Sequence, residues 1–152
     1  MSPININYVG YLITTDKTLM KVNDVYKWLS EESYWCKQIP FETFKASFDN
    51  SYCIGALICD RQIAYGRLVT DYATFGYLAD VYVEEAHRGK GISKKMMQLL
   101  FGLNWVKGLR HLALATKDAH GLYKQVGFVP LQIPERYMQI LRPNIYEQQS
   151  QQ

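Results

Sequence analysis

The spacing of apolar residues changes several times along the chain, and each change marks a predicted element. Residues 77–83 are almost continuously apolar, which is typical of a strand that is buried on both faces. Residues 93–106 carry apolar side chains at every third or fourth position, which predicts a helix with one buried face. A short basic loop with two glycines, residues 87–91, joins them. The chain is therefore organised around a strand–loop–helix unit.

The same patterns predict further elements on both sides of this unit. The predicted strands are residues 8–14, 52–59, 62–70, 109–116, 128–131 and 136–141. The predicted helices are residues 19–30, 41–50 and 119–126. The tight turn at Asp60 and Arg61 favours an antiparallel hairpin of the two strands beside it. From Pro143 the chain is polar and rich in glutamine, so we expect one domain over residues 1–142 and a disordered tail over residues 143–152.

Composition and charge limit the classes of function. The 152 residues suffice for one domain with a sizeable core, and a net charge of only +3 argues against a nucleic-acid binder with a broad basic face. No apolar run approaches the about 20 residues of a membrane span, and no signal peptide is recognisable, so we expect a cytoplasmic protein without a membrane partner. Three cysteines suit free thiols in a reducing compartment, and no cysteine and histidine spacing suggests a metal site.

The basic loop predicts an anion site at the start of the following helix. The first turn of a helix has N–H groups without helical partners and carries partial positive charge. Gly89 and Gly91 let the backbone approach a ligand that a Cβ atom would exclude, and Arg88 and Lys90 add positive charge. We therefore expect a ligand that carries phosphate. The alternative is an ordinary strand-to-helix turn that uses glycine only for its geometry.

Two known phosphate loops do not match this spacing. A Walker A loop requires glycine where Glu84 stands, and a dinucleotide fingerprint requires glycine where Lys94 stands. The remaining pattern is Arg/Gln-x-x-Gly-x-Gly/Ala, which Arg88, Gly91 and Ser93 fill, with serine as a small departure at the last place. This loop resembles the acetyl-CoA loop of the GNAT acetyltransferases (GCN5-related N-acetyltransferases).

A second stretch strengthens the resemblance. Residues 115–128 read as a strand end, then a helix with Leu122 and Tyr123, then Gly127 and Phe128 at the start of another strand. This run is similar to the second signature of the same family, and it follows the first at an ordinary separation. The resemblance covers most of residues 8–141. It implies an α/β fold with a central, mixed, mostly antiparallel sheet of about six or seven strands and about four flanking helices.

The resemblance also implies a cofactor, acetyl-CoA, and residues that hold it. The strand 81–83 would offer backbone groups to the pantetheine arm, and residues 88–93 would hold the pyrophosphate. The cofactor-binding residues implied are Val81, Tyr82, Val83, Arg88, Gly89, Lys90, Gly91, Ile92, Ser93 and Tyr123. Tyr123 falls on the tyrosine that protonates the departing CoA thiolate in many members, which a phenol with a pKa near about 10 can do. The alternative for Tyr123 is a buried packing residue.

The catalytic base is not assigned by the sequence. Several relatives carry Glu-Asp where this chain has Ala79 and Asp80, and strand alternation predicts that these two residues lie on opposite faces. A carboxylate in an apolar strand requires a partner. Asp80 either bonds a neighbouring backbone, tyrosine or arginine group, or points into the acceptor pocket as base or substrate anchor. We name Asp80 with Tyr123 as candidate catalytic residues, and His111 and His120 as further candidates for proton handling.

Aromatic residues in two loops suggest where the acceptor binds. Trp35 and Tyr72 lie in predicted connections, so with Asp80 they are candidate substrate-binding residues for an apolar or cationic amine. Aromatic residues in loops also cover the edge of a core, which is the alternative. The acceptor itself, a small molecule or a peptide, is not specified, and the resemblance is compatible with a homodimer.

Two functions follow from these observations. The first is transfer of an acetyl group from acetyl-CoA to a primary amine by direct attack, with no metal. The second is a non-catalytic CoA-binding sensor or interaction module with the same fold, which the missing glutamate at position 79 favours. A nucleic-acid-binding role for the surface lysines is disfavoured by the small net charge.

Overall fold

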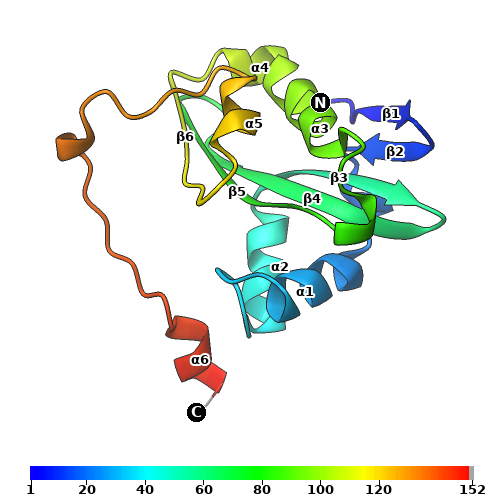
Figure 1. Ribbon diagram of the computed structural model, residues 1–152, viewed down its shortest axis with the longest axis horizontal. Helices are drawn as coiled ribbons and strands as arrows, with labels where there is room; N and C mark the ends of the chain where they lie inside the picture. Colours follow the sequence, from blue (N-terminus) through cyan, green and yellow to red (C-terminus); the bar gives the residue numbers. More distant parts are fainter. Residues whose placement is uncertain (151–152) are drawn as a thin grey trace.

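The computed structural model describes residues 1–150 and contains one six-stranded sheet with helices on both faces (Figure 1). The strands follow the order β1-β2-β3-β4-β5-β6, and all neighbours are antiparallel except β5 and β6, which are parallel. The strands are β1 Asn5–Tyr8, β2 Tyr11–Thr14, β3 Tyr52–Ile58, β4 Arg61–Thr70, β5 Phe75–Val83 and β6 His111–Leu114. The mixed, mostly antiparallel sheet predicted from the sequence is confirmed.

The helices form two layers. The helices α1 and α2 cover one face of the sheet, and α3, α4 and α5 cover the other (Figure 1). The α-helices are α1 Val22–Glu31, α2 Phe41–Asp49, α3 Ile92–Gly102, α4 Asn104–Lys107, α5 His120–Lys124 and α6 Ile145–Ser150. Short 3-10 helices are η1 Lys17–Leu19, η2 Glu85–His87 and η3 Pro134–Arg136. Among residues 1–150, no helix combines the length and apolar character that a membrane crossing requires.

Strand alternation divides the core into two apolar layers. Ala64 packs in the layer under α3, whereas the next residue, Tyr65, packs in the layer under α1 and α2. In the same way Ile54 packs in the layer under α3, and its neighbour Cys53 packs in the layer under α1 and α2. The α3 layer is completed by methionine and leucine side chains of the helix, and the α1–α2 layer by phenylalanines of α2. Both faces of the central strands are therefore buried.

The start of α1 is fixed to β4 by a buried glutamine. Gln62 Oε1 accepts a hydrogen bond from the Lys21 amide at 2.8 Å, and Gln62 Nε2 donates to the Ala64 carbonyl at 3.0 Å. The Gln62 amide donates to the Asp24 carboxylate in the first turn of α1. A Cβ atom at Gly55 would lie 2.4 Å from Gln62 Nε2, so glycine is required to make room for this side chain.

Four predicted elements differ from the structure. The strand predicted over residues 8–14 is the second half of a hairpin, because Val9 and Gly10 form a turn with positive φ angles of 43° and 89°. The helix predicted over residues 93–106 is interrupted at Leu103, whose backbone is extended, and so becomes α3 and α4. The strands predicted over residues 128–131 and 136–141 are wrong, since both segments are irregular and join no sheet.

The C-terminal end also differs from expectation. The structure places a short helix, α6, within the range for which the sequence predicted a disordered tail. Tyr146 of α6 packs against the apolar layer under α1 and α2, which gives this end of the chain a point of attachment. Residues 151–152 of the predicted tail lie outside the described residues. The division into a domain over residues 1–142 and a tail stays a prediction.

Candidate active site

The N-terminus of α3 presents backbone donors without a side-chain cap. Gly91 precedes the helix with a left-handed φ angle of 78°, and the first turn of α3 contains no acidic residue. The first hydrogen bond of the helix runs from the Lys95 amide to the Gly91 carbonyl at 3.0 Å. The amides of residues 92–94 therefore have no partner within the helix and are available to an anion.

The β1–β2 hairpin supports the loop that leads into α3. Tyr8 Oη donates a hydrogen bond to the Lys90 carbonyl at 3.3 Å, and Lys90 Nζ donates to Tyr11 Oη at 3.3 Å. Tyr11 Oη also lies 2.7 Å from His87 Nδ1. A Cβ atom at Gly91 would lie 2.8 Å from Tyr8 Oη. Glycine at this position is thus required both by its φ angle and by the close approach of a tyrosine hydroxyl.

Beyond Leu78 the strand β5 has an open edge. The parallel pairing of β5 with β6 runs from Phe75 with His111 to Leu78 with Leu114 and then ends, whereas β4 pairs with β5 as far as Val83. The two parallel strands therefore separate after Leu78 and Leu114. Arg88 Nε donates to the Val83 carbonyl at 2.9 Å and closes the far end of this edge. Within residues 1–150 no strand pairs with this edge between these points, so its backbone can pair with an extended ligand.

A bulge in β5 turns Asp80 toward the layer under α1 and α2. The register between β4 and β5 shifts here, and Asp80 has a φ angle of 57°. As a result Leu78 packs in the α3 layer, while Asp80, two residues later, bonds to residues of the opposite layer. The strict alternation expected for Ala79 and Asp80 is therefore interrupted.

Asp80 is the centre of a buried polar network. Its Oδ2 atom lies 2.6 Å from Arg67 Nε, and its Oδ1 atom accepts hydrogen bonds from Trp35 Nε1 at 2.8 Å and from the Cys36 thiol at 3.6 Å. Arg67 also donates to Ser51 Oγ at 3.1 Å. The structure thus shows the first of the two alternatives for Asp80, a carboxylate bonded to a neighbouring arginine.

Burial and charge shift the pKa values of two groups in this network. Burial lowers the pKa of Arg67, but the attraction of Asp80 outweighs it, so that the pKa of this guanidinium is raised. Burial, and then the charge of Asp80, raise the pKa of the Cys36 thiol to about 12. Arg67 is consequently charged and Cys36 is a neutral thiol at physiological pH.

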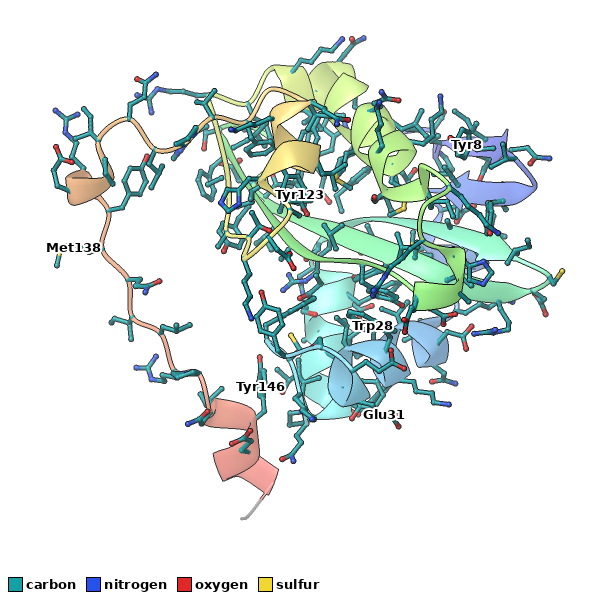
Figure 2. All side chains as sticks on the ribbon, viewed as in Figure 1. Tyr8, Trp28, Glu31, Tyr123, Met138 and Tyr146 are labelled. Atoms are coloured by element: carbon teal, nitrogen blue, oxygen red, sulfur yellow. The ribbon has the colours of Figure 1, made fainter. Side chains whose placement is uncertain are left out.

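Tyr123 lies on the other side of the sheet. It projects from α5 into the α3 layer and is 8 % exposed, and its ring meets Phe128 edge to face with centroids 6.1 Å apart (Figure 2). Burial, and then the charge of Asp118, raise the pKa of the Tyr123 hydroxyl. The hydroxyl therefore stays protonated at neutral pH, as a proton donor must.

The remaining predicted residues divide between core and surface. The Tyr82 ring stacks on Trp28 with centroids 3.9 Å apart, so its side chain belongs to the core and only its backbone faces the open edge of β5. Trp35 lies beside Asp80, whereas Tyr72 packs on Tyr52 and Trp105. Among the ring contacts of residues 1–150, Trp35 and Tyr72 have different neighbours, and their predicted role in binding the acceptor stays a prediction.

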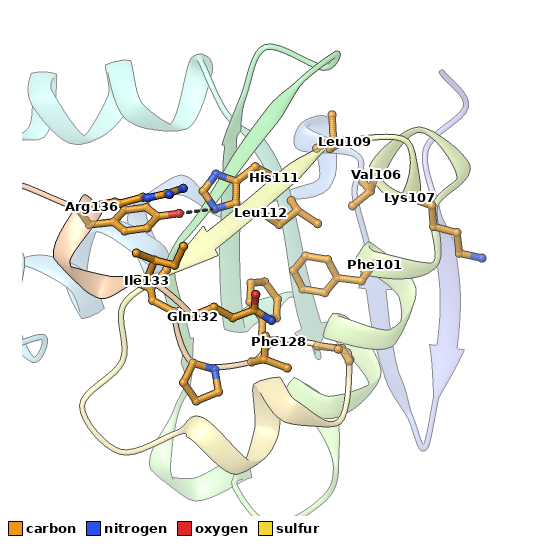
Figure 3. Close-up of a pocket in the computed structure, with 16 residues that line it drawn as sticks. Phe101, Val106, Lys107, Leu109, His111, Leu112, Phe128, Gln132, Ile133 and Arg136 are labelled. Carbon is orange, nitrogen blue, oxygen red and sulfur yellow. Dashed lines mark hydrogen bonds between the residues drawn. The ribbon is translucent and has the colours of Figure 1, made fainter.

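Sequence reasoning allowed for an arginine beside Asp80 but did not identify it. Arg67 and its second partner Ser51 were not singled out, although one signal was present: Arg67 and Asp80 are opposite charges in two largely apolar strands that are adjacent in the chain. A cavity of about 600 Å³ lies elsewhere, between α3, β6 and residues 126–137 (Figure 3). Of the predicted candidates, only His111 lines this cavity, where Tyr137 Oη lies 3.4 Å from His111 Nε2.

Comparisons with known proteins agree with this geometry. Residues 22–128 match the model of the acetyltransferase (GNAT) family. A solved structure from Xanthomonas campestris pv. campestris, described as a presumed GNAT acetyltransferase, superposes with a TM-score of 0.86 at 39 % identity over 90 % of this chain and 96 % of its own. A presumed acetyltransferase of Gibberella zeae is 30 % identical over 80 % of each chain.

A more distant structure shows the same fold with a ligand. A presumed acetyltransferase of Clostridium acetobutylicum, crystallised with acetyl-CoA, has a TM-score of 0.62 at 17 % identity over 86 % of this chain and 94 % of its own. The strand–loop–helix unit, the open edge of β5 and the matched family model lead to one assignment. The chain belongs to the GNAT family of acyltransferases.

Proposed function

We propose that this chain transfers the acetyl group of acetyl-CoA to a primary amine of a small molecule or a peptide. The observation that carries the proposal is that two groups of backbone atoms are available to a ligand on neighbouring elements. One is the set of amides at the start of α3, and the other is the backbone of β5 beyond Leu78. A diphosphate suits the first and an extended pantetheine arm with amide groups suits the second. Arg88 joins the two, since its Nε atom bonds to the Val83 carbonyl beside the loop.

The residues that would bind the cofactor come from one continuous stretch. The backbone of Val81, Tyr82 and Val83 would face the pantetheine arm. The loop and first turn, Arg88, Gly89, Lys90, Gly91, Ile92 and Ser93, would hold the diphosphate. Lys90 Nζ is already oriented by Tyr11 Oη, so part of the positive charge is positioned before the ligand arrives.

The reaction would be a direct transfer. The neutral amine nitrogen would attack the thioester carbon and the carbon–sulfur bond would break. The thiolate would receive the proton of Tyr123 Oη, and the proton that the nitrogen loses on becoming an amide would return the phenolate to a phenol. The raised pKa of Tyr123 keeps that proton in place at neutral pH. The amine has to arrive without its own proton, because a primary amine is mostly charged near pH 7.

Asp80 has a different part in this proposal. Both of its carboxylate oxygens accept hydrogen bonds from neighbouring side chains, and Arg67 neutralises its charge. We assign to Asp80 the positioning of Trp35 on the acceptor side rather than the removal of a proton. The absence of a free carboxylate at this bulge is also the observation that favours the alternative, a CoA-binding module without catalysis.

Calorimetry and a thiol-release assay test the proposal. CoA and acetyl-CoA should both release heat on binding and raise the melting temperature. Acetyl-CoA with a panel of polyamines, amino acids and peptides should produce free CoA thiol. Binding without turnover on any amine would support the non-catalytic module instead, and no heat from a folded protein would contradict both. A cytoplasmic location, and function without metal, nucleic acid or membrane, stay expectations.

A further inference from the structure

The connection between β6 and α5 carries a lysine to the opposite side of the sheet. Lys117 is exposed, and its Nζ atom lies over the ring of Tyr34, 5.5 Å from the ring centroid. Tyr34 belongs to the segment between α1 and α2, whereas α5 covers the other face of the sheet (Figure 1). Since β6 ends at Leu114, the lysine side chain crosses from one face to the other just beyond the end of this strand.

Tyr34 is connected to the open edge of β5 through Trp35. The two rings meet edge to face with centroids 4.9 Å apart, and Trp35 Nε1 donates to Asp80 Oδ1 at 2.8 Å. Asp80 lies in the part of β5 beyond Leu78 that forms this open edge. The Lys117 amine is therefore placed, through two aromatic rings, beside the stretch of backbone along which the pantetheine arm would lie.

An amine and the proposed proton donor thus come from one short segment of the chain. Tyr123 packs in the α3 layer, while Lys117 reaches the segment after α1. The sheet, with the open edge of β5, lies between these two layers. In a direct transfer the attacking nitrogen has to reach the thioester carbon, and the acid has to reach the sulfur. An amine and an acid on different sides of the cofactor suit both requirements.

We propose that the chain acetylates its own Lys117 when acetyl-CoA is bound. The inference rests on the proposed function, because it uses the same cofactor and the same acid. The ammonium first gives one proton to solvent, to which Lys117 is exposed. The neutral nitrogen then attacks the thioester carbon, the carbon–sulfur bond breaks, and the thiolate takes the proton of Tyr123 Oη. The proton that the nitrogen loses on becoming an amide returns the phenolate to a phenol, and the products are free CoA and the acetylated lysine.

The modification changes the acceptor side of the site. An acetylated lysine is neutral, so its attraction to the Tyr34 ring is lost. Tyr34 and Trp35 are 69 % and 38 % exposed, so both rings are accessible from solvent. After acetylation, a cationic acceptor no longer competes with the Lys117 ammonium for the face of Tyr34. The reaction thereby links the supply of acetyl-CoA to the state of the acceptor side.

Mass spectrometry of the intact full chain, incubated with acetyl-CoA and no added amine, tests the inference. We expect a gain of one acetyl group, release of an equal amount of CoA thiol, and a modified peptide that contains Lys117. Labelling of Lys117 should be at least about 100-fold faster in the native chain than in the urea-unfolded chain, because the fold brings the amine to the thioester and supplies an acid. The first-order rate constant should not depend on protein concentration, as expected for transfer within one chain.

Three variants separate this reaction from chemical acetylation of surface lysines. Lys117→Arg keeps a cation for the Tyr34 ring but has no amine nucleophile, so the rapid gain of one acetyl group should be lost. The matched control, Lys124→Arg, changes an exposed lysine of α5 and should be labelled at Lys117 as the wild type is. Tyr123→Phe should slow the labelling by at least about 100-fold, toward the rate of the unfolded chain. Circular dichroism and thermal unfolding check that each variant is folded.

The outcomes distinguish this inference from the proposed function. If the chain releases CoA thiol with an added amine while Lys117 stays unmodified, the inference is overturned and the proposed function stands. If Lys117 is labelled but no added amine is turned over, the inference stands and transfer to an external amine is contradicted. A folded chain that does neither contradicts both. Equal labelling of native and unfolded chains, or a rate constant that rises with protein concentration, would overturn the inference as well, because the amine would then react from solution or with another copy.

Discussion

Arg67 Nε lies 2.6 Å from Asp80 Oδ2, and both side chains are largely withdrawn from water. The other carboxylate oxygen accepts the indole N–H of Trp35, and Arg67 reaches Ser51 at the start of β3. The pair therefore connects β4 and β5, at the bulge in β5, to the segment between α1 and α2. A buried charge of this kind is tolerated only while its partner is present.

The first prediction concerns this pair. Asp80→Asn should lower the free energy of unfolding by about 3–5 kcal/mol, because Arg67 would remain buried without an opposite charge. The measurement is the urea midpoint at neutral pH. The matched control is Arg61→Met, which breaks the exposed pair with Glu84 and should cost no more than about 1 kcal/mol. Equal losses of unfolding free energy in the two variants would mean that the buried Asp80 pair contributes no more to stability than the exposed pair.

The second prediction concerns the proposed proton donor. Tyr123→Phe keeps the ring that packs on Phe128 but should reduce kcat by at least about 100-fold, while CoA binding by calorimetry stays unchanged. Because burial raises the pKa of Tyr123, the wild-type rate should not fall through loss of this proton at any pH below 10.0. Tyr77→Phe, a change in an exposed tyrosine of β5, is the control. A full rate in Tyr123→Phe at every pH would leave Tyr123 as a packing residue.

Much of the fold follows from local patterns, and the candidate acetyl-CoA loop follows from its resemblance to a family motif. The unit from β5 to α3 was predictable because the pattern of apolar residues changes at the loop. Before the loop the apolar residues are almost continuous, and after it they recur at every third or fourth position. The bulge at Asp80 was not, because alternation assumes a regular strand and one extra residue reverses the faces of all that follow. A signal was present nonetheless, since aspartate is enriched among residues with positive φ.

The two strands predicted after α5 failed for a different reason. Residues 136–141 do have a pattern of apolar side chains, but a strand forms only where a second strand supplies hydrogen bonds, and sequence spacing does not say which strand supplies them. The partners of Asp80 were missed for a similar reason. The contact between Trp35 and Asp80 depends on how the connection after α1 folds, which no local pattern determines.

The third prediction tests the glycine that precedes α3. Gly91→Ala should cost about 1–2 kcal/mol, since alanine disfavours a left-handed backbone, and its Cβ atom would meet Tyr8 Oη. It should also weaken CoA binding. Removing the hydroxyl with Tyr8→Phe should recover the steric part of the loss and leave the part due to the φ angle. Gly102→Ala, at the end of α3 with open space around its Cβ position, is the control and should not destabilise the protein.

The fourth prediction concerns the cysteines in native protein. Cys59 is exposed, whereas Cys36 and Cys53 are buried. Burial raises the pKa of Cys36 from 9.0 to about 12, so the thiolate fraction near neutral pH is lower by about 1,000-fold. A thiol reagent should modify one group per native chain and three after denaturation. Rapid modification of more than one native thiol would mean that the layer around Cys36 opens readily.

The raised pKa of Cys36 should also make the free energy of unfolding depend on pH in the alkaline range. The folded pKa of Cys36 is raised above the unfolded value, so its favourable contribution is fully present below pH 9.0 and is lost as the pH rises toward about 12. Cys36→Ala removes this contribution, and the fall in unfolding free energy over that range should become shallower, though not flat, because burial also raises the pKa of Cys53 and of Tyr65. Cys59→Ala, at an exposed position, should leave the slope unchanged. The measurement is the urea midpoint at several pH values across this range. An unaltered slope in Cys36→Ala would show that water reaches the Cys36 thiol in the folded protein. Water would then also reach the Asp80 carboxylate, to which this thiol donates a hydrogen bond.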